Sequence, residues 1–159
     1  MDISNNSEKK LRKAISCVVF NKNKKFLMVC GAKWPKGSWC FPQGGINENE
    51  THREAVKREL NEELGTNNFD IIGKSIVEHV YLFPEEIAQK KGFDGQYQTI
   101  WFVKLLEEES KIKFPEEEIS EAKWFEQDEI IENMAFPEQK ETFKKVVEEL
   151  TKLFNERII

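Results

Sequence analysis

The chain has 159 residues, of which 39% are hydrophobic and 33% are charged. This length fits one globular domain with a sizeable core, and the composition is ordinary for a globular protein. The formal net charge is −5 and the isoelectric point is about 5.3, which argues against broad binding to the phosphate backbone of a nucleic-acid duplex. No apolar run resembles a membrane span or a secretory signal, so we expect a cytoplasmic protein that does not bind a membrane.

The three cysteines are odd in number and lie in or near apolar runs. None of them has the spacing of metal ligands. We therefore expect Cys17, Cys30 and Cys40 to be buried thiols, as in proteins of a reducing compartment.

The first half of the chain reads as short strands. We expect residues 1–10 to be disordered and residues 11–159 to form a single domain. Apolar runs at residues 15–20 and 26–30 flank a polar turn, which predicts a β-hairpin. After a loop, residues 39–41 form another short strand that leads to a pair of glycines.

A helix with clear start and stop signals follows the glycines. Thr51 and Glu54 form a capping box, so the helix should begin at Thr51. Gly65 can take the left-handed conformation that ends it. Residues at helical spacing form an apolar stripe that can lie on a sheet: Val56, Leu60 and Leu64.

The second half alternates between strands and helices. A long strand is expected at residues 71–81, with Gly73 marking a bulge, and a second strand at residues 97–106. Between them, residues 84–95 form a surface loop with a short helical turn, and residues 128–134 form a short helix. The apolar residues of a closing amphipathic helix are Phe143, Val146, Val147, Leu150, Leu153 and Phe154. This order predicts the α/β class, with a mixed sheet covered on two sides by helices.

Three carboxylates share one patch of the predicted central helix. Glu59 lies three and four residues from Glu62 and Glu63, and like charges at this spacing repel unless a cation lies among them. Such oxygen ligands suit Mg²⁺ or Mn²⁺. Gly44 and Gly45 would let a backbone carbonyl or amide approach such an ion or a phosphate. The alternative is a glutamate-rich helix face that is merely solvated.

The spacing of these residues favours the metal site over the solvated face. It matches the Nudix box, with Gly44, Glu50 and the run Arg58-Glu59-Leu60-x-Glu62-Glu63-x-Gly65. Only Thr66 departs, because it stands where an aliphatic residue is usual. The sequence thus resembles the Nudix superfamily of pyrophosphate-bond hydrolases.

Further segments resemble one subgroup, the bacterial RNA pyrophosphohydrolases and the related diadenosine polyphosphate hydrolases. These segments are residues 38–47, Tyr81-x-x-Pro84, residues 95–102, and Glu118 placed six residues before Trp124. The subgroup usually opens with Tyr-Arg-Pro, whereas this chain keeps only Arg12 of that motif. A stretch similar to Trp-x-Phe-Pro-x-Gly also occurs in mRNA decapping enzymes, another Nudix branch.

The resemblance implies a Nudix fold, in which a mixed sheet is sandwiched between helices. It also implies hydrolysis by water with more than one bound Mg²⁺ or Mn²⁺ ion. The implied metal ligands are Glu59, Glu62, Glu63, the Gly44 carbonyl and Glu118. Glu118 would act as the base or as an extra ligand, with Glu116, Glu117 and Glu121 as nearby alternatives. Glu50 and Arg58 would form an orienting ion pair.

Candidate substrate contacts lie elsewhere in the chain. Arg12, Lys33 and Lys36 are candidates for phosphate binding, although surface lysines are common. Tyr81 and Phe136 are candidates for stacking on a base, although core packing is the commoner fate of an aromatic residue. The implied substrate is an RNA 5′-triphosphate end or a dinucleoside polyphosphate. Alternatives are another nucleoside-diphosphate-linked molecule and a non-catalytic, nucleotide-binding regulatory domain; the oligomeric state stays open.

Overall fold

The computed structural model describes residues 9–157. The predicted disorder of residues 1–10 therefore falls mostly outside the described residues. Lys10 exchanges two hydrogen bonds with Asp94, in which each backbone amide is the donor, at 2.7 Å. The elements in chain order are β1 (Leu11–Phe20), β2 (Phe26–Gly31), β3 (Trp39–Cys40), β4 (Gln43–Gly45), α2 (His52–Leu64), β5 (Phe69–Leu82), α3 (Glu85–Lys91), β6 (Gly95–Leu105), the 3₁₀ turn η1 (Glu109–Lys111), β7 (Ile119–Phe125), the 3₁₀ turn η2 (Gln127–Glu129), α4 (Ile130–Asn133) and α5 (Pro137–Asn155).

The strands form one mixed sheet with β1 at its centre. The strand order is β3-β2-β1-β6-β5, while β7 pairs with β2 and β4 pairs with β1. β1 runs parallel to β6 along its whole length, and the other pairs are antiparallel. β1 pairs with β2 only at Phe20, whereas its residues Ala14, Ile15 and Ser16 pair with β4. This change of partner brings the glycines of β4 to the middle of the sheet.

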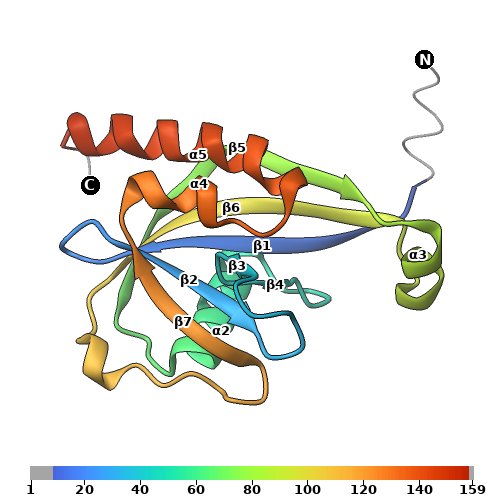
Figure 1. The fold of residues 1–159 in the computed structure, drawn as a ribbon, viewed down its shortest axis with the longest axis horizontal. Coiled ribbons are helices and arrows are strands. Elements are labelled where there is room, and N and C mark those ends of the chain that lie inside the picture. Colours follow the sequence, from blue (N-terminus) through green and yellow to red (C-terminus); the bar gives the residue numbers. More distant parts are fainter. Residues whose placement is uncertain (1–8, 158–159) are drawn as a thin grey trace.

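Helices cover both faces of the sheet, as predicted. α2 lies on one face, and α4 and α5 lie on the other (Figure 1). Side chains alternate along β1, so that Cys17 and Val19 pack toward α2 whereas Val18 and Phe20 pack toward α5. The predicted apolar stripe of α2 is fully buried, and the closing helix buries Phe143, Val146, Leu150 and Phe154.

The connection between β5 and β6 projects from the body of the protein. It carries α3, which lies at the end of the sheet away from α5 (Figure 1). None of the residues of α3 is buried. The short helical turn predicted in this segment is thus a helix of seven residues. The predicted bulge is also present, because the pairing of β5 with β6 shifts register between Ile71 and Gly73.

The ends of α2 have the predicted geometry. The Thr51 hydroxyl accepts a hydrogen bond from the Glu54 amide at 3.1 Å, and the Glu54 carboxylate accepts one from the Thr51 amide at 3.0 Å. Gly65 ends the helix in the left-handed conformation, with φ of 67°. Thr66 is buried beyond that end, where its hydroxyl accepts from the Asn68 amide and donates to Glu107. The threonine that replaces the usual aliphatic residue at position 66 is therefore accommodated because its hydroxyl is hydrogen bonded.

The cysteines are free and buried, as predicted. Within residues 9–157, no helix is long and apolar enough to cross a membrane.

We expect Thr51→Ala to lower the free energy of unfolding by about 1 kcal/mol, because the amide of Glu54 loses its acceptor. Urea unfolding at neutral pH measures the change. Thr51→Ser keeps a hydroxyl at this position and serves as the matched control. A loss in the serine variant equal to that in the alanine variant would show that the cap contributes nothing.

Candidate active site

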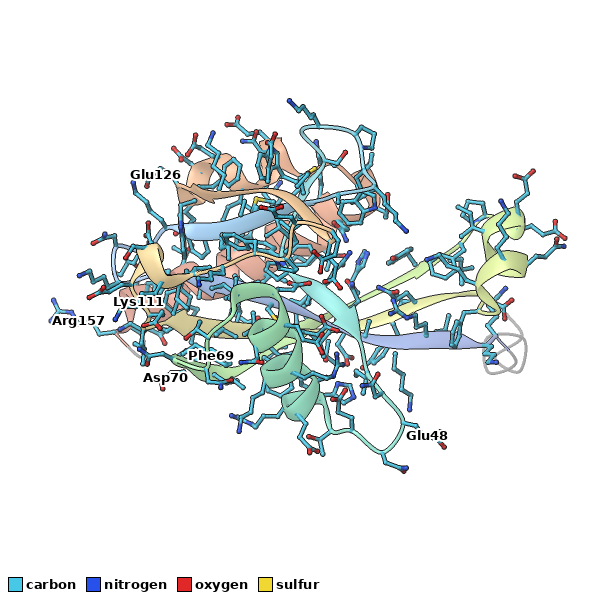
Figure 2. The ribbon with its side chains drawn as sticks, turned by 90° about the horizontal axis from the view of Figure 1, so that it is seen from below. Glu48, Phe69, Asp70, Lys111, Glu126 and Arg157 are labelled. Carbon is cyan, nitrogen blue, oxygen red and sulfur yellow. The ribbon has the colours of Figure 1, made fainter. Side chains whose placement is uncertain are left out.

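The site is built from β4, the loop that follows it and the second half of α2. Figure 2 shows Glu48 at the tip of this loop, pointing away from the sheet. Glu50, two residues later, turns back toward the body of the protein, where it accepts a hydrogen bond from the Asn47 amide at 2.9 Å. The loop therefore presents one carboxylate to solvent and one to the site.

Arg58 on α2 ties this loop to the helix. Its guanidinium donates two hydrogen bonds to Glu50, at 2.7 and 2.9 Å, one to the Gly45 carbonyl at 2.8 Å, and one to Glu59 at 2.8 Å. Its distance to the Glu62 carboxylate is 3.5 Å. The hydrogen bonds from Arg58 and then from the Asn47 amide lower the pKa of Glu50 to about 2. The expected ion pair between Glu50 and Arg58 is thus present, and it fixes the position of the glycines.

Close contacts leave no room for a side chain at either glycine of β4 while Glu59 and Arg12 keep their positions. A Cβ atom on Gly44 would lie 2.1 Å from the carboxylate carbon of Glu59. A Cβ atom on Gly45 would lie 2.5 Å from the Arg12 guanidinium. Any other residue would push these two side chains away. The backbone of β4 therefore lies directly between a carboxylate of α2 and an arginine of β1.

Glu63 is the carboxylate with the least favourable surroundings. Its side chain is buried, and its Oε2 atom has no hydrogen-bond partner. Burial, together with the charges of Glu59, Glu118 and Glu62, raises its pKa to about 8. Burial also raises the pKa of Glu59, although Arg58 opposes that effect.

These surroundings fit a divalent cation. A buried carboxylate oxygen without a donor, next to three more carboxylates, gains most from a bound positive charge. In the present side-chain conformations of residues 9–157, however, no three acidic, histidine or cysteine side chains lie close enough together to coordinate one ion. Glu59 is instead hydrogen bonded to Arg58, so an ion would compete with the guanidinium for this carboxylate.

A cavity of about 570 Å³ opens beside these carboxylates. It brings together most of the predicted site residues, namely Arg12, Lys33, Gly44, Glu59, Glu62, Glu63, Tyr81 and Glu118. Glu50 and Arg58 are outside the lining. Arg58 acts on it through its hydrogen bonds to Glu59 and Gly45, and Glu50 holds Arg58 in place. Lys36 and Phe136 are also outside the lining. The Phe136 ring packs edge-on against the ring of Trp34, at 5.3 Å between centroids, and Trp34 does line the cavity.

Sequence reasoning missed several lining residues. Gln96 on β6 accepts a hydrogen bond from Arg12 at 3.0 Å, and it orients the guanidinium within the cavity. Its position one strand away from Arg12 follows from the parallel pairing of β1 with β6, which the sequence did not indicate. Lys91 comes from α3, and nothing in its local sequence separates it from other surface lysines. Trp34, Phe41 and Gln43 also line the cavity and were not predicted, whereas Glu117, which lines it too, was among the alternatives to Glu118.

Known proteins resemble both the sequence and the fold. The family model described as NUDIX domain matches residues 10–148. An RNA pyrophosphohydrolase of Sulfurovum sp. is 36% identical over 121 residues, which cover 74% of this chain and 76% of the relative. An RNA pyrophosphohydrolase of Wolbachia pipientis is 30% identical over 153 residues, which cover 92% and 93% of the two chains.

Solved structures support the fold alone, because their sequence identity is low. An Ap4A hydrolase of C. elegans in a binary complex has a TM-score of 0.66 and 21% identity, with 89% of this chain and 99% of that chain covered. The dihydroneopterin triphosphate pyrophosphohydrolase of E. coli has a TM-score of 0.70 and 17% identity, with 87% and 97% covered. The sequence match over most of the chain, together with this fold and the carboxylates beside the cavity, shows that the protein belongs to the Nudix hydrolase family.

Proposed function

We propose that this Nudix hydrolase acts on the 5′-triphosphate end of RNA and splits a pyrophosphate bond there. The observation that carries the chemistry is the buried, unpartnered oxygen of Glu63 among three other carboxylates. The relatives named RNA pyrophosphohydrolases support the choice of substrate. Dinucleoside polyphosphates are the second candidate, because the same pyrophosphate group would occupy the same cavity.

Nudix hydrolases generally need divalent metal ions. We propose that Glu59, Glu62 and Glu63 hold more than one Mg²⁺ or Mn²⁺ ion, with the Gly44 carbonyl as a further ligand. When bound, such ions neutralise charge on the phosphate oxygens and lower the pKa of a bound water. Arg58 keeps Gly45, and with it the neighbouring Gly44, against α2, so the helix and the β4 carbonyl would face the same ions.

The remaining roles fall to residues on the other walls of the cavity. Glu118 would accept the proton of the attacking water or provide another ligand. Arg12, held by Gln96, and Lys33 would bind the phosphate oxygens. Tyr81 would stack on the base of the first nucleotide or of its neighbour. Lys36 and Phe136 have no direct role in this proposal, because they lie outside the lining.

A panel of substrates with product analysis tests the proposal. The expected result with Mg²⁺ or Mn²⁺ is the conversion of triphosphorylated RNA to monophosphorylated RNA, with release of pyrophosphate or orthophosphate. Adenine mononucleotides formed faster from a dinucleoside polyphosphate would favour the second candidate. Binding without turnover of any nucleotide, measured by calorimetry, would contradict an enzymatic role.

We expect the affinity for Mn²⁺ to rise with pH. The raised pKa of Glu63, about 8, means that an ion must displace a proton from this carboxyl at lower pH. The affinity should therefore rise about tenfold per pH unit between pH 6 and pH 8, as measured by calorimetry in two buffers that report proton release. Glu63→Gln should bind more weakly, lose this pH dependence and lose most of the turnover. A steep pH dependence in this variant would exclude Glu63 as its origin.

The metal-free protein provides a second measurement of the same group. The folded pKa of Glu63 lies above its ordinary value of 4.5, so the folded state holds a proton that the unfolded state releases. The stability of wild-type protein in chelator should fall as pH rises from about 4.5 to about 8. Glu63→Gln should flatten this fall, and an unchanged fall would contradict the assignment.

The three glutamates near Glu118, namely Glu116, Glu117 and Glu121, allow a matched test of the distal carboxylate. Glu118→Gln should lower kcat by roughly 100-fold, because it removes a proton acceptor or a ligand. Glu116→Gln removes the same charge from an exposed residue outside the cavity lining, and it should keep wild-type kcat. Steady-state rates with one RNA substrate measure both variants. Equal losses in the two variants would contradict a specific role for Glu118.

A further inference from the structure

Buried polar atoms without a hydrogen-bond partner gather in one region away from Glu63. Within residues 9–157 they are His79 Nε2 on β5, Gln98 Oε1 on β6 and Gln139 Oε1 on α5. Their side chains are only 3%, 0% and 4% exposed. An unpartnered polar atom in the interior costs free energy, so three of them in one region indicate a shared hydrogen-bonding site. We refer to His79, Gln98 and Gln139 together as the buried polar cluster.

The three side chains of the cluster face a common space between β5, β6 and α5. His79 and Gln98 are directly opposite each other in the antiparallel pairing of β5 with β6, so their side chains project from the same face of the sheet. The Nδ1 atom of His79 lies 2.7 Å from the hydroxyl oxygen of Thr142 on α5. Gln139 precedes Thr142 by three residues, so both side chains lie on the same side of the helix.

Gln98 connects the buried polar cluster to the cavity. Its Nε2 atom donates a hydrogen bond to Oε1 of Gln43 at 2.7 Å, and Gln43 lines the cavity. The strand β1 lies between β4 and β6, and Ala14 on β1 pairs with Gln98, so a small side chain leaves room for this contact. Because Gln98 occupies the carbonyl oxygen of the Gln43 amide, the NH₂ group of Gln43 is the part that remains for a ligand.

The hydrogen-bonding capacity of the cluster selects one form of His79. Burial lowers the pKa of His79, although the charge of Glu138 opposes this, so the ring is neutral at pH 7 with one donor and one acceptor nitrogen. With the proton on Nδ1, all three unpartnered atoms would be acceptors, and one water can donate to only two. With the proton on Nε2, the Thr142 hydroxyl donates to Nδ1, and the cluster has one donor and two acceptors. One water completes that set, because it accepts one hydrogen bond and donates two.

We propose that His79, as the Nε2–H tautomer, and Gln98 are positioning residues that act through one buried water. Together they fix the amide of Gln43 so that its NH₂ group faces the cavity. There, beside Arg12, the NH₂ group donates a hydrogen bond to an oxygen of the phosphate chain of the substrate. A freely rotating amide would also present its carbonyl oxygen, which repels a phosphate. The contact with phosphate rests on the proposed function, whereas the arrangement of the cluster does not.

The tautomer of His79 is measured directly by ¹⁵N NMR of the side chains. The chain has two histidines, so the spectrum of His52→Asn assigns the signals of His79. Wild-type protein near neutral pH should show a protonated Nε2 and an unprotonated Nδ1 for His79. A protonated Nδ1 would overturn the inference. This measurement needs neither metal nor substrate.

Gln98→Met tests the positioning of Gln43, because methionine is similar in size and cannot donate to the Gln43 amide. The KM of the fastest substrate in the panel should rise about tenfold, whereas kcat should stay within about twofold. This split is expected when a contact made equally to the bound substrate and to the transition state is lost. An unchanged KM, or a loss in kcat alone, would exclude this role of Gln98.

Two variants of His79 separate the roles of its nitrogens. In His79→Asn the amide reaches the position of Nδ1 and keeps the contact with Thr142. In His79→Gln the amide reaches the position of Nε2 and keeps a donor for the water. The asparagine variant should therefore raise KM as Gln98→Met does, and the glutamine variant should stay near the wild-type KM. Equal KM values in the two variants, or the reverse order, would contradict the role of Nε2.

His52→Asn is the matched control, because the Nδ1 atom of His52 also meets a threonine hydroxyl, that of Thr99, at 2.8 Å. His52 lies outside the cavity lining, so this variant should keep the wild-type KM and kcat. A rise in KM equal to that of His79→Asn would overturn the proposal. Urea unfolding midpoints establish that each variant is folded under the assay conditions.

Failure of this inference is distinguishable from failure of the proposed function. If no member of the panel is hydrolysed, the proposed function fails, and the tautomer of His79 alone decides the inference. If RNA is hydrolysed with an unchanged KM in Gln98→Met, the proposed function stands and the positioning of Gln43 by Gln98 is excluded.

Discussion

The structure depends on one unfavourable arrangement, the burial of the Glu63 carboxylate beside Glu59. The α2 helix buries Glu63 because the same turns carry the apolar stripe that packs on the sheet. Desolvation and neighbouring negative charges then raise the pKa of Glu63 to about 8, and one of its oxygens has no partner. Burying these carboxylates lowers the stability of the protein unless a cation binds among them. The stability of the fold is thereby linked to the binding of the metal ions that Nudix hydrolases use.

The remaining architecture places a backbone strand beside these carboxylates. β1 pairs with β4 where it has left β2, so two glycines lie between Glu59 and Arg12. Arg58 joins the two parts by bonding to Glu50, Glu59 and the Gly45 carbonyl. Its guanidinium thus neutralises part of the negative charge of α2. Because it is bonded to Glu59, it competes with a metal ion for that carboxylate. An arginine suits this position, because its planar group can satisfy several acceptors at once.

Sequence reasoning predicted the features that depend on local chemistry. The capping box, the left-handed Gly65 and the apolar stripe of α2 follow from residues within a few turns of one another, and all are present. The expected strand at residues 39–41 is shorter, because Pro42 cannot donate to a ladder and separates β3 from β4. The bulge at Gly73 was likewise predicted, because it depends on a single glycine within a strand. The apolar stripe of α5 was predicted from the helical spacing of its apolar residues.

Features that depend on distant residues could not be predicted. The contact of Arg12 with Gln96 follows from a parallel pairing of strands that are 84 residues apart in sequence. Lys91 lines the cavity, whereas Lys36 does not, although both are lysines in polar connections. Phe136, which immediately precedes α5, packs against Trp34 rather than lining the cavity, and this contact joins residues that lie far apart in the sequence. Spacing to Trp124 selects Glu118 among its neighbours, and Glu117 also reaches the lining.

Anomalous diffraction from crystals grown with Mn²⁺ tests the central claim most directly. The account predicts peaks next to the Glu63 carboxylate, with Glu59 turned from Arg58 toward an ion. An anomalous map without a peak near Glu63, in crystals where Glu59 stays bonded to Arg58, would contradict it.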